Sequence, residues 1–175
     1  MHPLQPFLEL AAPHGLGFDQ PGGVFRVPLT GAYGYHSGMK VVGVVTGYCL
    51  LAAALAGLPP PRREEIAILS GHPGSGMEDT FEYFTRCVSG GRYQRHEFAA
   101  GLRIPEAEGV FRWRVQIGDA RRDLSLREGV VPAVLFTAVP AGEEAARLAY
   151  QLEVASRMLV ADPGTLFDSI AEGTA

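Results

Sequence analysis

The sequence predicts a single α+β domain in which a mixed or antiparallel sheet packs against helices. Three observations predict this class. A chain of 175 residues that is 47% hydrophobic suits one domain with a substantial core. Residues 111–117 alternate between apolar and polar side chains, which is typical of an antiparallel strand with one buried face. Residues 143–160 repeat apolar side chains at helical spacing. We therefore expect residues 1–175 to form one domain.

The N-terminal region predicts short elements separated by glycine and proline. Residues 3–12 are amphipathic and predict a short helix, whereas residues 14–23 are punctuated by glycine and proline and predict a loop. Residues 24–29 predict a short strand. Residues 30–40 are rich in glycine and aromatic side chains, and we expect a loop there that leads into the next helix.

Residues 41–58 carry no charged side chain, and 18 residues is the lower limit for a membrane span. The segment is rich in glycine and alanine, which favours a helix buried inside a globular domain, because small residues allow close approach. Three prolines at 59–61 end this helix at about Ala56. We expect no membrane partner. No secretory signal or disulfide framework is visible, which predicts a cytoplasmic protein.

The rest of the chain mixes strands and helices. The amphipathic segment 143–160 is followed by Asp162, Pro163 and Gly164, which stop the helix. Gly118 and Asp119 predict a hairpin turn. The expected elements are strands at 66–69, 93–99, 111–117, 124–127 and 130–139, and helices at 77–88 and 143–160.

The net charge of −4 argues against a nucleic-acid partner held by bulk electrostatics. The charge is uneven, because residues 86–127 hold nine arginines against five acidic residues. Such arginine-rich strands present either a solvated face or an anion-binding face. The sequence leaves both alternatives open.

Two glycine-rich segments, each with a histidine, open the helices predicted at 41–56 and 77–88. His36 lies in the first and His72 in the second. The N–H groups at the start of a helix are free to bind an anion. Ser75 is placed to cap its helix, but no lysine follows Gly76, so the loop is not a phosphate-binding Walker A loop. We expect the two loops to converge on one pocket for a small-molecule ligand.

Two stretches carry a resemblance to a known family. The first runs through Gly38, Gly43, Gly47 and Tyr48, and the second is residues 79–87, which hold an aspartate and end in a cysteine. They resemble the core motifs of the FmdE family of formylmethanofuran dehydrogenase proteins. The resemblance covers about residues 35–126, and only its second motif is fairly specific.

This resemblance implies a divergent FmdE-like core domain with a metal or small anionic ligand and a redox-associated role. It suggests a divalent transition metal such as zinc. The residues that we expect at the site are, for metal binding, His36, His72 and Cys87; for ligand binding, Tyr35, Lys40, Gly74, Ser75 and Gly76; and for catalysis, Cys87 and Asp79.

The chain departs from the family at several motif positions. Ser37 and Met39 stand where the family has histidines, Val41 stands at its first cysteine, and Ser75 stands where it often has another. No cysteine follows Cys87, so we expect no counterpart of the family's C-terminal zinc-finger module.

Two alternatives remain open. In one, the protein is a metal-independent enzyme that uses Cys87 or Ser75 as nucleophile, a nearby histidine as base and loop N–H groups against an oxyanion. In the other, it is a non-catalytic binding or assembly protein. Its apolar helices also predict a homodimer.

Overall fold

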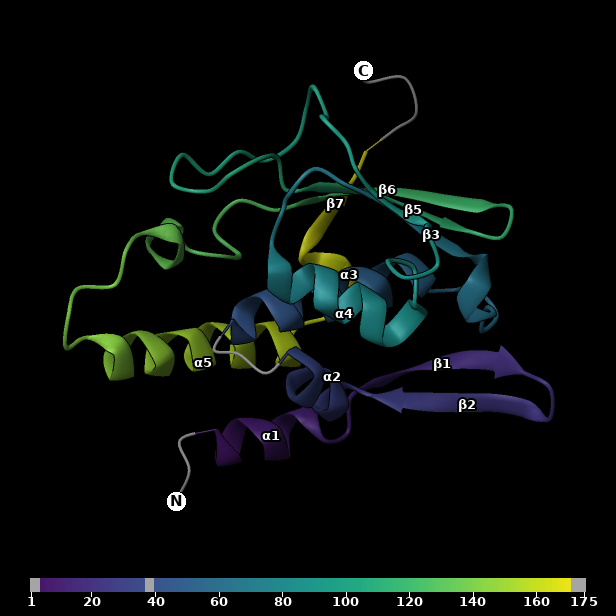
Figure 1. Cartoon of the computed structure of the whole chain (residues 1–175), viewed down its shortest axis with the longest axis horizontal. Helices are drawn as coiled ribbons and strands as arrows, with labels where there is room; N and C mark the ends of the chain where they lie inside the picture. The colour runs from purple at the N-terminus through teal and green to yellow at the C-terminus, as the bar shows by residue number, and fades with distance from the viewer. Residues whose placement is uncertain (1–3, 37–39, 171–175) are drawn as a thin grey trace.

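The computed structural model describes residues 4–36 and 40–170, which form one α+β domain, as predicted (Figure 1). Its helices are α1 (Gln5–Ala11), α2 (Leu29–His36), α3 (Val41–Leu55), α4 (Ser75–Thr85) and α5 (Glu144–Val160). Its strands are β1 (Gly15–Gln20), β2 (Gly23–Pro28), β3 (Ile66–Ser70), β4 (Tyr93–Arg95), β5 (Arg112–Ile117), β6 (Ala120–Leu126) and β7 (Phe167–Ser169). Three 3-10 turns are η1 (Arg63–Glu65), η2 (Ala133–Phe136) and η3 (Pro163–Thr165).

The main sheet has five strands in the order β4-β3-β5-β6-β7. All neighbours are antiparallel except β3 and β4, which are parallel, so the sheet is mixed. A parallel pair needs a crossover connection, and α4 provides it. Strands β1 and β2 form a separate antiparallel hairpin.

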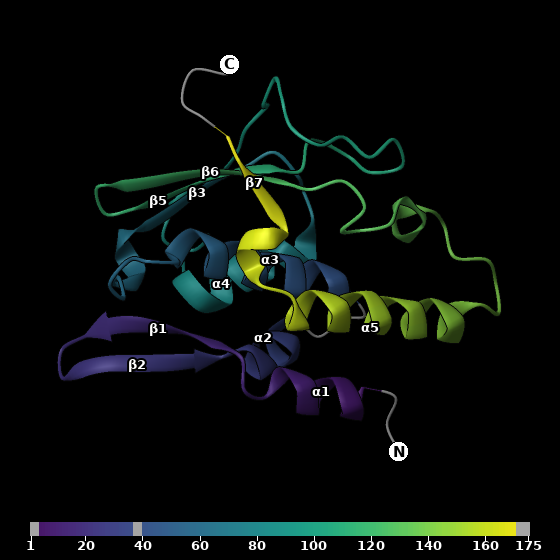
Figure 2. The same cartoon turned by 180° about the vertical axis from the view of Figure 1, so that it is seen from behind.

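The elements form layers with α3 at the centre. Helices α3 and α4 cover one face of the five-stranded sheet, and α1, α2 and the β1–β2 hairpin lie on the far side of these helices (Figures 1 and 2). Helix α5 packs along α3. The core joins the layers through fully buried side chains such as Trp113 of β5, Phe81 of α4 and Leu50 of α3. This central place explains why α3 carries no charge.

The predicted buried helix is confirmed, since α3 spans Val41–Leu55 and most of its side chains are buried. Gly47 allows it to approach α4, because a Cβ there would lie 3.0 Å from Cβ of Thr80. Cys49 is buried in the core. Within residues 4–36 and 40–170, no helix combines the length and apolar character that a membrane crossing requires.

Two glycine-rich segments predicted as loops are regular elements instead. Most of residues 14–23 form β1, which pairs with β2 and buries Phe18. Residues 29–36 form α2 despite Gly31, because that glycine serves packing rather than turning. A Cβ on Gly31 would lie 2.0 Å from the hydroxyl of Tyr83 on α4. Gly31 therefore reflects a close contact between helices rather than a loop.

The strand predicted at 130–139 is wrong. The segment contains only the short turn η2, preceded by Pro132, which has no N–H group to donate to a ladder. Instead β7 pairs with β6, from Leu126 opposite Phe167 to Leu124 opposite Ser169. The apolar run at 130–139 could not indicate that the later segment β7 occupies the sheet edge beside β6.

Candidate functional site

A cavity of about 440 Å³ opens at the N-terminal end of α4. Its wall combines polar and charged side chains with a mainly apolar surface. The polar and charged side chains are those of Lys40, Thr46, His72, Ser75, Glu108 and Gln151, and the apolar side chains include Val42, Met77, Phe111, Val131, Leu135 and Phe136. Such a mixture suits a small organic ligand with one polar head.

The first turns of α3 and α4 touch beside this cavity, at Gly43 and Gly76. A Cβ on Gly43 would lie 3.4 Å from Cα of Gly76. A Cβ on Gly76 would lie 3.1 Å from the carbonyl oxygen of Lys40, which immediately precedes α3. The two segments predicted to converge therefore do so at their helix starts.

Lys40 and Ser75 meet across this contact. The Lys40 ammonium donates a hydrogen bond of 2.9 Å to Oγ of Ser75. Ser75 is the first residue of α4 rather than its cap, so the expected capping role is wrong; Gly74 is the N-cap and makes no side-chain bond. The first N–H groups of α4 have no carbonyl partner within the helix, and they lie beside this ammonium.

His72 lines the cavity, and a hydrogen bond fixes its ring. Its Nδ1 lies 2.9 Å from the carbonyl oxygen of Glu108, so Nδ1–H donates and Nε2 keeps its lone pair. The ring stacks on Phe111, with centroids 4.1 Å apart. Burial is the main cause of a lowered His72 pKa; the bond to Glu108 opposes the shift, and the charge of Arg95 reinforces it. The imidazole is therefore neutral near pH 7.

His36 takes a different position. Its Nδ1 lies 2.6 Å from Oδ2 of Asp79, one turn beyond Ser75 on α4. The His36 side chain is only 8% exposed, and its Nε2 is buried without a hydrogen-bond partner. Neither His36 nor Asp79 is among the described residues that line the cavity. The predicted shared pocket thus holds His72 but not His36.

Two further predicted site residues also lie outside the cavity wall, as far as the structure describes it. Tyr35 is 53% exposed, and its ring faces Tyr83. Cys87 is fully buried beyond the C-terminal end of α4, where Arg86 turns the chain with a φ of 52°. The eleven residues of α4 span about 16 Å, so Cys87 lies at the opposite end from Ser75.

The residues expected to bind a metal do not come together. His72, His36 and Cys87 contact different parts of the structure, and residues 4–36 and 40–170 contain no group of three or more His, Cys, Asp or Glu side chains that could hold an ion. Burial also raises the pKa of the Cys87 thiol, although Thr85 and Arg92 oppose this. The described residues therefore do not fit the family's metal.

Several cavity residues were not predicted from the sequence. Phe111 directly precedes β5, Phe136 lies in η2 and Gln151 lies on α5. Local sequence patterns do not indicate that these three segments meet. Gln151 had a usable signal. It falls on the apolar stripe of α5, between Leu148 and Ala155, where a polar side chain stands out.

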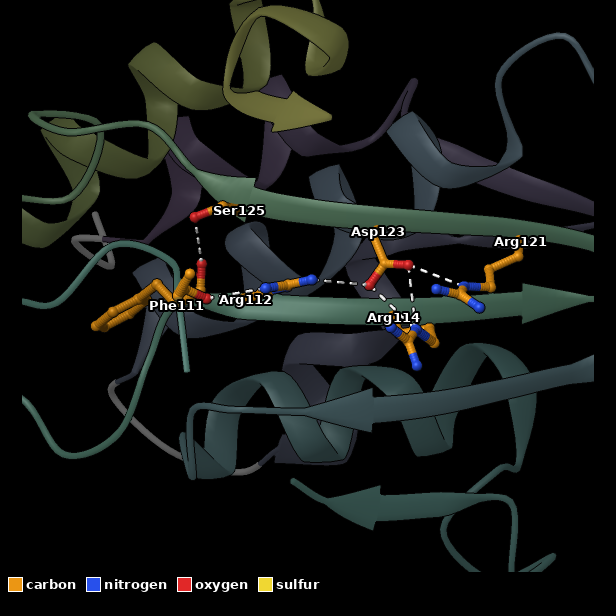
Figure 3. A network of polar contacts seen from close by, with 7 residues as sticks. Phe111, Arg112, Arg114, Arg121, Asp123 and Ser125 are labelled. Atoms are coloured by element: carbon orange, nitrogen blue, oxygen red, sulfur yellow. Dashed lines mark hydrogen bonds and ion pairs between the residues drawn. The ribbon is translucent and has the colours of Figure 1, made fainter. Parts of the chain in front are cut away.

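The arginine-rich strands form a separate polar cluster on the sheet face that points away from α3 and α4 (Figure 3). Arg112, Arg114 and Arg121 all reach the carboxylate of Asp123, whose side chain is 4% exposed. Burial alone would raise the Asp123 pKa, but hydrogen bonds from Arg114 and Arg121 outweigh it and lower the pKa. This carboxylate therefore stays charged and anchors β5 to β6.

A second hollow, of about 810 Å³, lies on the other side of the loop that follows β3 and shares Pro73 and Glu108 with the cavity. Its charged side chains include both arginines and glutamates, so no single sign dominates. We therefore take the cavity at α4 as the candidate site. Comparison of the chain with protein-family models, with curated proteins and with solved structures finds no match to any of them.

Proposed function

We propose that the chain binds a small organic anion, consisting of a carboxylate and an apolar body, in the cavity at the N-terminal end of α4. One observation carries this proposal. The Lys40 ammonium lies 2.9 Å from Oγ of Ser75, beside the first N–H groups of α4, on the wall of a mainly apolar cavity. Positive charge and free N–H groups together favour a carboxylate.

The charge of the wall supports an anion at this end. Lys40 is the only lysine of the chain, and it lies at the cavity rather than on a remote surface. Glu108 is the one acidic side chain among the described lining residues, and it is exposed. Its carboxylate therefore remains in solvent, where its repulsion is screened.

The apolar wall supports an organic rather than an inorganic anion. Val131, Leu135 and Phe136 come from the irregular segment between β6 and α5 and face Met77 and Val42 on the helices. Apolar surface contributes about 25 cal/mol for each Å² removed from water, so a branched or cyclic body adds affinity that a bare phosphate lacks.

The resemblance to the FmdE family enters the same proposal. In it, the chain is a divergent relative whose glycine-rich segments enclose an anion in place of a metal, and the redox-associated role remains part of this proposal. The contact of the two segments at Gly43 and Gly76 supports the shared cavity. The alternatives with a nucleophilic Ser75 or Cys87, and an assembly protein, stay predictions.

A titration tests the proposal. We expect 4-methylpentanoate to bind and to perturb NMR signals of residues around Ser75, while the neutral 4-methylpentanamide of the same shape binds roughly 10-fold more weakly, because a charge-assisted bond is lost. Lys40→Met should weaken the acid but not the amide. Arg157→Met, which removes an exposed charge on α5, is the matched control and should change neither. Equal binding of acid and amide would exclude the anion site.

A further inference from the structure

We propose that this cavity is a proton-transfer site, in which His72 removes a proton from the carbon next to the keto group of a 2-oxo acid. The inference rests on the proposed function and adds a substrate class and a reaction to it. It depends on three features of the cavity: a fixed imidazole, the position of its Nε2, and the donors beside that atom.

The imidazole of His72 is held from three sides. Its Nδ1–H donates to the Glu108 carbonyl oxygen at 2.9 Å, its face stacks on Phe111 with rings 21° from parallel, and its centroid lies 6.0 Å from that of Phe136 in an edge-on contact. Here the bond at Nδ1 leaves Nε2 as the acceptor, which is the arrangement that a general base requires.

Nε2 lies at the N-terminal end of α4. A Cβ on Gly74, the N-cap of this helix, would be 2.7 Å from Nε2, so only glycine leaves room there. Next to the same residue lie the first N–H groups of α4, and beyond them the Lys40 ammonium on Ser75. A base and a set of cationic or N–H donors therefore line the same cavity.

These donors suit an enolate. When a proton leaves carbon 3 of a 2-oxo acid, negative charge develops on the oxygen at carbon 2, next to the carboxylate. Preorganised N–H groups and an ammonium stabilise such charge, because they already point to the place where it develops. The neutral state of His72 near pH 7, which its burial favours, matches the role of the base.

The step is balanced without any further reactant. The bond between carbon 3 and hydrogen breaks, and the proton moves to Nε2 of His72. The electron pair forms the double bond between carbons 2 and 3, and the carbonyl pair moves to the oxygen at carbon 2. Return of a proton from Nε2 to carbon 3 restores the acid, and exchange of that proton with solvent makes the reaction visible.

The probe is 4-methyl-2-oxopentanoate in D₂O, followed by ¹H NMR of its carbon-3 methylene group. We expect this signal to disappear faster with the protein than in buffer alone. His72→Gln should abolish the acceleration while the probe still binds. His96→Gln, which changes an exposed histidine outside the cavity wall as described, is the matched control and should keep the wild-type rate.

A second variant covers the case in which His72→Gln does not fold. Lys40→Met changes an exposed side chain, and at saturating probe it should slow exchange by roughly 100-fold, the usual effect of removing one oxyanion donor. An unchanged rate at saturation would overturn the role of this donor.

The outcomes separate the two proposals. If the probe binds but its exchange is not accelerated, or if folded His72→Gln exchanges at the wild-type rate, the proton-transfer inference is wrong and anion binding stands. If neither the probe nor 4-methylpentanoate binds, the proposed function fails and this inference fails with it.

Discussion

Gly43 of α3 and Gly76 of α4 face each other so closely that a Cβ on Gly76 would lie 3.3 Å from Cα of Gly43. The same added atom would be 3.1 Å from the carbonyl oxygen of Lys40. Its neighbours are all backbone atoms, which cannot rotate away. The distance between the two helix starts, and with it the placing of Lys40 on Ser75, therefore depends on the absence of a side chain here.

Gly76→Ala should push the start of α4 away from α3. We expect a loss of about 1–3 kcal/mol in the free energy of unfolding, as for other overpacked sites, and weaker binding of 4-methylpentanoate. Gly34→Ala is the control, because no atom lies within 4 Å of a Cβ there, and alanine should stabilise α2 slightly. Urea denaturation and the NMR titration measure both effects. Unchanged anion affinity in Gly76→Ala would show that the contact does not place the site.

Asp123→Asn should be strongly destabilising. The change removes the charge that three arginines share, while Arg112 stays buried, and breaking a buried ion pair costs about 3–5 kcal/mol. Asp119→Asn, at an exposed turn position between β5 and β6, is the matched control and should change stability by less than about 0.5 kcal/mol. Equal urea midpoints for the two variants would show that the cluster does not stabilise the sheet.

The lowered pKa of His72 predicts how stability depends on pH. As the pH falls below the ordinary histidine value of 6.5, the unfolded chain takes up a proton at this residue before the folded protein does, so the folded state loses stability. Above 6.5 this effect is absent. His72→Gln should therefore lose less stability than the wild type between about pH 7.5 and pH 5.5, measured by urea denaturation.

The comparison isolates His72. The pKa of His14 is also lowered, by burial and by Arg26, but His14 is present in both proteins and its effect cancels. A wild-type slope in His72→Gln would mean that the imidazole is not held neutral in the folded protein.

Both thiols should be inert in the native protein. Cys49 and Cys87 are buried, and burial raises the pKa of Cys49 to about 12 and also raises that of Cys87. The thiolate is the reactive form, so 5,5′-dithiobis(2-nitrobenzoic acid) should react with neither residue until the chain is unfolded. Rapid labelling of Cys87 alone in the folded protein would contradict this prediction and support Cys87 as a nucleophile.

Strong apolar periodicity predicted those helices and strands whose own sequence is enough to indicate their structure. The helices at 41–55 and 144–160 and the strand at 112–117 follow patterns that burial on one or all sides imposes locally. The patterns failed where the deciding contact lies elsewhere in the chain. Gly31 suggested a loop, but it is a glycine because the Tyr83 hydroxyl, far along the sequence, occupies the space of a side chain.

The site shows the same division. The glycine loops indicated that Lys40, His72, Gly74, Ser75 and Gly76 belong near each other, since each opens a helix, and the cavity contains all five. The pattern of glycines and helix starts does not indicate which way the neighbouring side chains point. His36 therefore turned to Asp79, and Cys87, at the other end of α4, entered the core.

The cavity wall is assembled from distant parts of the chain, from Lys40 before α3 to Gln151 on α5. The site exists only when these segments are folded together, so a ligand that fits it binds the folded chain and not the unfolded one. Binding and global unfolding then form one linked equilibrium, and a ligand at 100 times its dissociation constant adds about 2.7 kcal/mol to the unfolding free energy. The melting temperature of the intact protein can therefore report ligand binding. Compounds can be screened by how far they raise this temperature.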